Sequence, residues 1–265
     1  MDPSRRVAIV TGGSRGLGRA IAVCLAKSGI DVAVNYRDEE GAALETAEQI
    51  RSHGQRAITL QADLTSSAAP NTLITRTLEE LGELDIVVNN VGEFFFRRLG
   101  EMDHKEWQYV LESNLHSVFY MCSAVLPLMR QRKQGQIINI GLSPTYLVRG
   151  APNISAYAIA KTGVLVLTRS LAVEEAPYNI RVNCVSPGLI DNGHLAPKQR
   201  EWMEKRVPLG RLGAPEDVGN AVAFLVSDNA SYISGANLAV AGAWDWDDRP
   251  TYQDGDVQNL FTGNH

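Results

Sequence analysis

Short apolar runs rich in β-branched residues alternate along the chain with longer stretches of helical character. The apolar runs predict strands at residues 6–11, 30–35, 56–61, 84–89, 136–140 and 180–185. The intervening stretches predict helices at residues 16–28, 39–53, 68–81, 104–131 and 156–175. Continuous apolar strands are typical of parallel strands covered on both faces. This alternation predicts an α/β fold, a doubly wound parallel sheet with right-handed crossovers.

No linker or break in composition divides the chain before about residue 244, so we expect one domain over residues 1–244. Residues 245–265 are polar and acidic and predict a C-terminal tail. Trp244 and Trp246 at this boundary either belong to a partly ordered extension, dock on a neighbouring subunit or cover a pocket.

Composition and charge narrow the class of protein. A hydrophobic fraction of 45% with 23 Gly and 11 Pro excludes collagen-like and disordered chains. A net charge of −5 argues against nucleic acid or an anionic membrane as partner. We expect a cytoplasmic protein, because no apolar run has the length of a signal peptide or a membrane span.

Cysteine and histidine offer no metal site in this sequence. Cys24, Cys122 and Cys184 lie far apart and predict buried, reduced thiols. The five histidines are scattered without the spacing of metal ligands. We therefore expect no metal.

A glycine-rich turn follows the first predicted strand and opens the first predicted helix. Its glycines, Gly12, Gly16 and Gly18, permit a tight turn and a close approach of the backbone to a ligand. The N-terminus of the helix then offers free N–H groups and the positive end of its dipole to a pyrophosphate. The turn predicts a dinucleotide site, although its spacing differs from GxGxxG.

Two arginines indicate which dinucleotide is bound. An NAD-binding protein usually places an acidic residue at the end of the second strand, where this chain has Asn35-Tyr36-Arg37. Arg15 and Arg37 can meet a 2′-phosphate with charge-assisted hydrogen bonds, which favours NADP(H). Asp38 and Glu39 follow directly and can blunt this preference.

Tyr157 and Lys161 form the candidate catalytic pair. Their spacing of four residues places both side chains on one face of a predicted helix. A free tyrosine titrates near pH 10, and an adjacent cation lowers its pKa. Tyr157 is therefore a candidate proton donor and acceptor near neutral pH.

Several motifs in order resemble the short-chain dehydrogenase/reductase family, over about residues 6–242. They are Thr11-Gly12-Gly13-Ser14-Arg15-Gly16-Leu17-Gly18, Asp63-Leu64, Asn89-Asn90-Val91-Gly92, Tyr157 with Lys161, and Pro187-Gly188, followed by a C-terminal pattern like that of the bacterial 3-oxoacyl-(acyl-carrier-protein) reductases. The resemblance implies a Rossmann-type sheet of about seven strands and hydride transfer between a nicotinamide and a carbonyl. It also implies a homotetramer or homodimer.

The resemblance assigns roles to individual residues. Tyr157 would protonate the developing oxyanion, Lys161 would lower the pKa of Tyr157 and bind the nicotinamide ribose, and Asn114 would help to hold a proton-relay water. The implied cofactor-binding residues are Gly12, Ser14, Arg15, Gly16, Leu17, Gly18, Asn35, Tyr36, Arg37, Asp63, Leu64, Asn90, Val91, Gly92, Tyr157, Lys161, Pro187, Gly188 and Ile190.

The chain departs from the family pattern at two positions. Leu142 occupies the place of the usual serine, and Ser143 follows one residue later. An insertion before Tyr157 can return the hydroxyl of Ser143 to the substrate oxygen, so we predict Ser143 as the fourth catalytic residue. The alternative is a site without this donor, which would suit a substrate other than a simple ketone or shift the role to another residue. Asn192 stands where relatives place a threonine, and its amide can make similar hydrogen bonds.

Two segments are expected near the substrate. The loop of residues 93–98, from Glu93 to Arg98, follows the fourth strand and is expected to line the pocket. Its phenylalanines, Phe94, Phe95 and Phe96, can alternatively pack in the core or against a second subunit. Residues 194–207 predict a helical substrate lid with Leu195, Trp202 and Met203 as candidate pocket residues. The alternative for these three residues is the ordinary packing of an exposed helix.

Three functions remain open at this point. The first is an NADPH-dependent reductase of a 3-oxoacyl or other ketone substrate, with Arg130, Arg132 and Lys133 as half of a docking patch for an acidic carrier, weakened by nearby Glu174 and Glu175. The altered serine motif and the phenylalanines make a pteridine reductase the second. A non-catalytic NADP(H)-sensing protein is the third.

Overall fold

The computed structural model describes residues 5–144 and 150–244. Its centre is one sheet of seven parallel strands in the order β3-β2-β1-β4-β5-β6-β7. The strands are β1 (Val7–Val10), β2 (Asp31–Tyr36), β3 (Ala57–Gln61), β4 (Ile86–Asn89), β5 (Gly135–Ile140), β6 (Ile180–Pro187) and β7 (Asn237–Val240). The larger helices are α1 (Gly16–Lys27), α2 (Glu40–Ser52), α3 (Ala69–Leu81), α4 (His104–Leu111), α5 (Ser117–Arg132), α6 (Ser155–Glu174), α7 (Pro197–Glu204) and α8 (Pro215–Val226). The predicted doubly wound sheet is confirmed.

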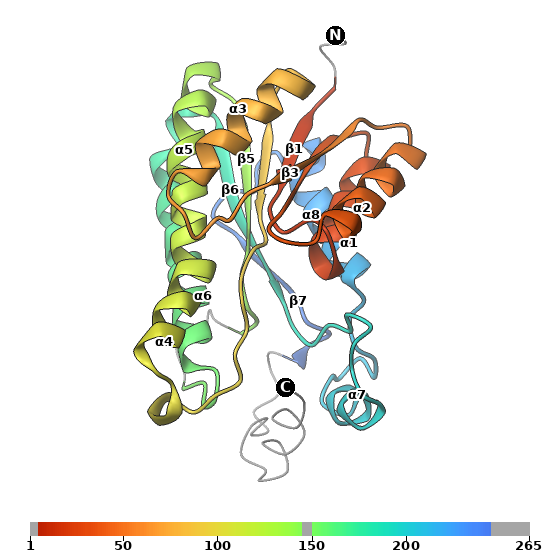
Figure 1. Ribbon diagram of the computed structural model, residues 1–265, viewed down its shortest axis with the longest axis vertical. Coiled ribbons are helices and arrows are strands. Elements are labelled where there is room, and N and C mark those ends of the chain that lie inside the picture. Colours follow the sequence, from red (N-terminus) through yellow and green to blue (C-terminus); the bar gives the residue numbers. More distant parts are fainter. Residues whose placement is uncertain (1–4, 145–149, 245–265) are drawn as a thin grey trace.

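The sheet separates two layers of helices, as Figure 1 shows. Alternate residues of β1 belong to different cores: Ala8 and Val10 pack with α1, α2 and α8, whereas Val7 and Ile9 pack with α3, α5 and α6. All four residues are fully buried. Because both faces of a central parallel strand are covered, its sequence is continuously apolar, which is the pattern that predicted it.

The stretch predicted as one helix over residues 104–131 is divided in the structure. A capping box of Asp103 and Glu106 begins α4, a π-helical turn spans Glu112–His116, and α5 continues to Arg132. A π-turn rotates the residues it contains relative to the regular helix. It carries Asn114, which is fully buried.

Helix α6 is 20 residues long and apolar enough to cross a membrane by length and composition alone. This finding corrects the expectation that no segment reaches that length. One face of α6 is buried through Ala160, Val164, Leu165 and Thr168. Packing of this face against the sheet accounts for part of the apolar sequence, since 44% of the apolar window is buried.

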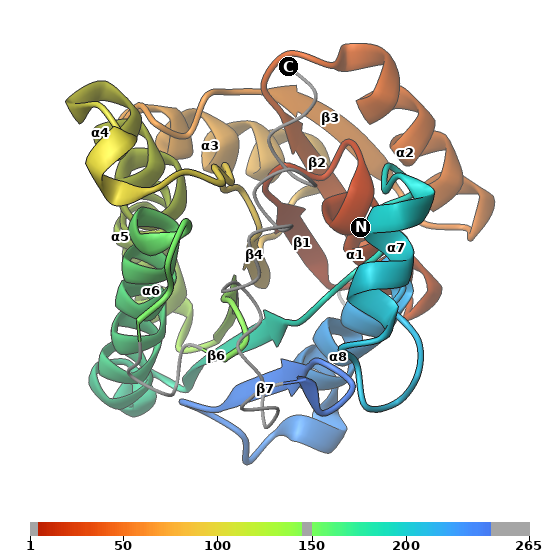
Figure 2. The ribbon, with the colours of Figure 1, turned by 90° about the horizontal axis from the view of Figure 1, so that it is seen from below.

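The chain reverses direction of winding at β1, with β2 on one side and β4 on the other. Loops that leave the carboxyl ends of these two strands diverge and leave a crevice, the usual ligand site of such sheets. Figure 2 views this edge, where α4 and α7 lie on opposite sides.

Candidate active site

A pocket of about 610 Å³ lies at the carboxyl edge of the sheet. Each of the 19 residues predicted to bind the cofactor lines it, from Gly12 in the first loop to Ile190 after β6. Of the four predicted catalytic residues, Tyr157 and Lys161 line the pocket, whereas Asn114 and Ser143 do not.

The glycine-rich turn is built for close backbone approach. A β-carbon on Gly18 would lie 2.1 Å from the carbonyl oxygen of Gly12, so the turn can close only with glycine at this position. Gly16 has a φ of +51° and no atom within 4 Å of its would-be β-carbon. Arg15 precedes α1 without a side-chain cap, which leaves the first N–H groups of the helix for a ligand. This cradle fits a pyrophosphate.

Two asparagines hold the glycine-rich turn in place by hydrogen bonds to its backbone. Nδ2 of Asn90 donates to the carbonyl oxygens of Thr11 (3.0 Å) and Gly12 (3.2 Å). Oδ1 of Asn35 accepts from the N–H of Gly12 (3.1 Å), and its Nδ2 donates to Leu60 and Ala62. Asn35 therefore holds the turn against the end of β3, a positioning role in addition to lining the pocket.

Tyr157 and Lys161 meet on one face of α6, as the spacing predicted. Nζ of Lys161 lies 5.6 Å from the centre of the Tyr157 ring and donates to the carbonyl oxygen of Ile140 (2.9 Å). Burial lowers the pKa of Lys161 to about 8, with Cys184 acting weakly in the opposite direction. At neutral pH the ammonium is still mostly charged and lies next to the Tyr157 ring.

Asn114 lies directly behind this pair. Its Nδ2 donates to the carbonyl oxygens of Glu93 (2.8 Å) and Val110 (3.0 Å), which fixes the carboxamide. Among the described residues its buried Oδ1 has no hydrogen-bond partner. A β-carbon on Gly92 would lie 2.1 Å from this oxygen and 3.3 Å from Nζ of Lys161. Asn114 and Lys161 therefore approach the same point, which only glycine leaves open.

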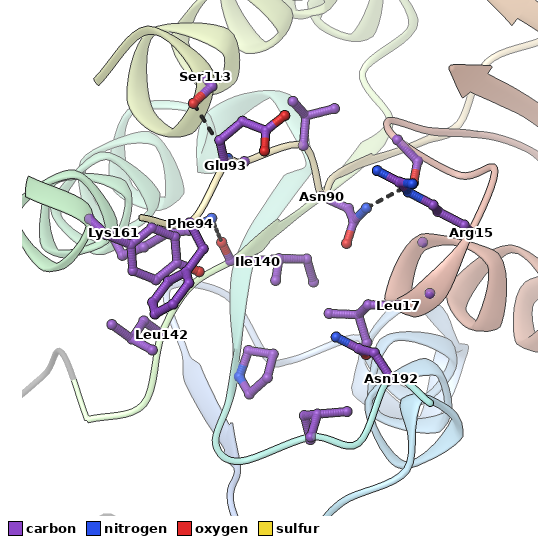
Figure 3. Close-up of a pocket in the computed structure, with 18 of the residues that line it drawn as sticks. Arg15, Leu17, Asn90, Glu93, Phe94, Ser113, Ile140, Leu142, Lys161 and Asn192 are labelled. Carbon is purple, nitrogen blue, oxygen red and sulfur yellow. Dashed lines mark hydrogen bonds between the residues drawn. The ribbon is translucent and has the colours of Figure 1, made fainter. Parts of the chain in front are cut away.

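Among the described residues that directly follow β5, the side chain that lines the pocket is that of Leu142. Leu142 lines the pocket, while Ser143 is fully buried and does not. A β-carbon on Gly141 would lie within 2.7 Å of Cys184 and Ser186, so the backbone here is fixed against β6. The prediction that Ser143 presents its hydroxyl to the substrate is not met by this geometry. Leu142, Phe94 and Lys161 all line the pocket and can be followed in Figure 3.

Arg15 and Arg37 both line the far end of the pocket, and both have acidic partners. Arg15 pairs with Glu39. Arg37 donates to Asp38 and to the hydroxyl of Tyr109, each at 2.6 Å, and these contacts raise its pKa. The acidic neighbours expected to blunt a preference for NADP(H) are thus in direct contact with the arginines.

Apolar side chains line the substrate end of the pocket. Phe94 packs edge-on against the ring of Tyr157, with ring centres 5.2 Å apart. Met203 of α7 and Trp244 also line the pocket, which supports the pocket-covering alternative for Trp244. Of the predicted lid residues, Leu195 and Trp202 do not line it and pack instead around Met203 and Val207. Residues 245–265, the predicted tail, lie outside the described residues.

The basic residues considered for carrier docking lie away from the pocket. Arg132 donates to Leu84 (2.9 Å) and Asp85 (2.9 Å), which precede β4, whereas the pocket lies beyond its other end. Arg130 pairs with the fully buried Glu175. Figure 1 shows this end of α5 remote from α4 and α7. A docking patch built on Arg130, Arg132 and Lys133 beside the pocket mouth is therefore wrong.

The described residues contain no group of His, Cys, Asp or Glu that can hold a metal. All three cysteines are buried, and burial raises the pKa of each thiol, to about 12 for Cys122. These thiols are poor nucleophiles.

Several pocket residues were not identified from the sequence as part of the site. They are Ala62, Thr65, Ser113, Ile140, Gly141, Ile154 and Leu189. Most of them directly neighbour a predicted motif residue at the carboxyl end of a strand, and this position was the available signal.

Comparisons with known proteins agree with this geometry. A family model described as enoyl-(acyl carrier protein) reductase matches residues 12–243. A 3-oxoacyl-[acyl-carrier-protein] reductase of Staphylococcus aureus (strain Mu50) is 38% identical over 238 residues, covering 89% of this chain and 96% of the relative. The corresponding Chlamydia muridarum reductase is 37% identical over 241 residues, with the same coverage. A crystal structure from Sinorhizobium meliloti 1021, of a protein provisionally assigned as a short-chain alcohol dehydrogenase, has a TM-score of 0.85 and 35% identity, covering 90% of this chain and 96% of that one.

Proposed function

This chain belongs to the short-chain dehydrogenase/reductase family, and we propose that it is an NADPH-dependent reductase of 3-oxoacyl thioesters. The buried Lys161 beneath the ring of Tyr157, at the end of a dinucleotide cradle, carries the proposal. Similarity to the 3-oxoacyl reductases of two bacteria over nearly the whole chain supports the choice of substrate class. The pteridine reductase and sensor alternatives have no comparable support.

In this proposal NADPH supplies the hydride, and the protein supplies the proton and the orientation. The phenol of Tyr157 donates its proton to the substrate oxygen as negative charge develops there. The ammonium of Lys161, held by Ile140, favours the resulting phenolate and keeps two donors for the cofactor ribose or a water. Oδ1 of Asn114 is the buried acceptor that holds a water for reprotonation.

Within the described part of the chain, the wall after β5 presents Leu142 in place of a hydroxyl donor, and this affects how the carbonyl is held. One donor directed at an oxyanion is commonly worth about 10²–10³ in rate. Tyr157 is then the main donor to the substrate oxygen, and Phe94, Leu142 and Met203 hold the acyl chain by apolar contact.

Oxidation of NADPH in the presence of a panel of substrates tests the proposal. The panel contains an acetoacetyl thioester, a crotonyl thioester, a dihydropterin and an activated ketone, with NADH as the control cofactor. We expect turnover of the acetoacetyl thioester. Exclusive turnover of the crotonyl thioester or of the pterin would reassign the substrate, and tight NADPH binding without any turnover would favour the sensor.

We further propose that the enzyme is cytoplasmic and assembles as a homodimer or homotetramer. Ile159, Val166 and Val173 are 52%, 60% and 77% exposed and follow one another at seven-residue intervals along α6. Phe119 on the neighbouring α5 is 53% exposed. An exposed apolar stripe over two adjacent helices fits an interface with a second copy of the chain.

A further inference from the structure

More acidic than basic groups surround the cofactor-phosphate end of the pocket. Arg15 and Arg37 meet Asp38, Glu39 and Glu93 there. All five residues line the pocket. A phosphate dianion that enters this group of charged side chains gains favourable interactions only if one of the arginines gives up its carboxylate partner and binds the phosphate instead.

Glu93 reaches Arg37 from the opposite wall of the pocket. Its Oε1 lies 3.5 Å from Nη1 of Arg37 and 3.4 Å from the hydroxyl of Tyr109, which itself accepts from Arg37. Arg37 follows β2, Glu93 follows β4, and Tyr109 belongs to α4. The contact therefore joins two walls of the crevice through one guanidinium.

The backbone of Glu93 is held by two contacts. Its carbonyl oxygen accepts from Nδ2 of the buried Asn114 (2.8 Å), and its N–H lies 3.4 Å from Oγ of Ser113 (Figure 3). Asp38, in contrast, follows Arg37 directly in the chain and contacts it from the same wall of the pocket. Glu93 therefore holds Arg37 from a fixed point across the pocket.

We propose that Glu93 is a cofactor-selecting residue, whose carboxylate competes with the 2′-phosphate of NADP(H) for Arg37. The side chains of Arg37 and Glu93 are 45% and 43% exposed, so their pair is weak and exchangeable. A phosphate offers a stronger, bidentate partner to the same guanidinium. Glu93 thus reduces the preference for NADPH over NADH. This inference rests on the proposed use of NADP(H).

Dissociation constants of the purified full-length protein for NADPH and NADH, from titrations of cofactor fluorescence, test the inference. The variants are Glu93→Gln, Arg37→Gln and their double mutant. Glu40→Gln is the control, because Glu40 is exposed, carries the same charge and does not line the pocket. We expect Glu93→Gln to raise the ratio of the NADH to the NADPH constant by about two- to fivefold. The rise should disappear in the Arg37→Gln background, and Glu40→Gln should match the wild type.

Three results would overturn the inference: an unchanged or lower ratio in Glu93→Gln, an equal rise in Glu40→Gln, or the same rise without Arg37. These outcomes are separable from failure of the proposed function. A wild-type protein that binds neither cofactor overturns both, whereas NADPH turnover with an unchanged ratio overturns only the role of Glu93.

Discussion

Replacing Gly92 with alanine tests whether the position of Asn114 matters for turnover. The new β-carbon would lie 2.1 Å from Oδ1 of Asn114, more than 1 Å short of the 3.4 Å at which ordinary contact begins. The carboxamide cannot easily withdraw, because Nδ2 is held by Glu93 and Val110 in a fully buried site. Either the Asn114 side chain or the loop after β4 must move by about 1 Å. A misplacement of this size in a catalytic site commonly costs about 100-fold in rate.

The assay is NADPH oxidation with an acetoacetyl thioester, together with thermal unfolding to establish that the variant is folded. Gly41→Ala is the matched control, since a β-carbon on this exposed glycine of α2 has no atom within 4 Å. The control should keep wild-type turnover and gain about 0.5–1 kcal/mol of stability. A folded Gly92→Ala enzyme with kcat within twofold of wild type would refute the assigned role of Asn114.

Three further predictions follow from the same structure. Burial lowers the pKa of Lys161 from 10.5 to about 8, so between these pH values the unfolded chain holds a proton that the folded chain has lost, and the stability of the wild type rises with pH. The melting temperature of Lys161→Met should therefore exceed that of the wild type most at pH 7 and least near pH 10. A difference in melting temperature that stays constant with pH would count against a buried ammonium. Ser143→Ala should leave kcat/KM unchanged, whereas Leu142→Ser, which puts a hydroxyl on the pocket wall, should raise thioester turnover by about tenfold or more. A large loss of kcat/KM in Ser143→Ala would show that the Ser143 hydroxyl reaches the substrate. Val166→Asp, in the middle of the exposed stripe of α6, should reduce the particle mass measured by light scattering, and an unchanged mass would place any interface elsewhere.

Most of the fold and of the cofactor site could be predicted from the local spacing of residues in the sequence. The strands were predictable because the parallel strands are buried on both faces, and the turn from Gly12 to Gly18 because its backbone geometry requires glycine. The pairing of Tyr157 with Lys161 depends only on the pitch of one helix. Strand β7 was not located, since its four residues include only partly buried or exposed positions.

Features that depend on contacts between distant elements were not predictable. The orientation of Ser143 depends on how Gly141 packs against Cys184 and Ser186 of β6. The clustered basic residues Arg130 and Arg132 gave no indication of the edge of the sheet at which α5 ends. Contacts such as that of Arg37 with Glu93, from two loops of the crevice, depend on the assembled fold.

Comparison of Tyr157→Phe with the wild type tests the central claim most directly. The measurement is the steady-state rate of NADPH oxidation with an acetoacetyl thioester, alongside the dissociation constant for NADPH. We expect the wild type to turn over and the variant to lose about 10²–10⁴-fold in kcat while it still binds NADPH. A Tyr157→Phe variant that keeps full turnover would contradict the account.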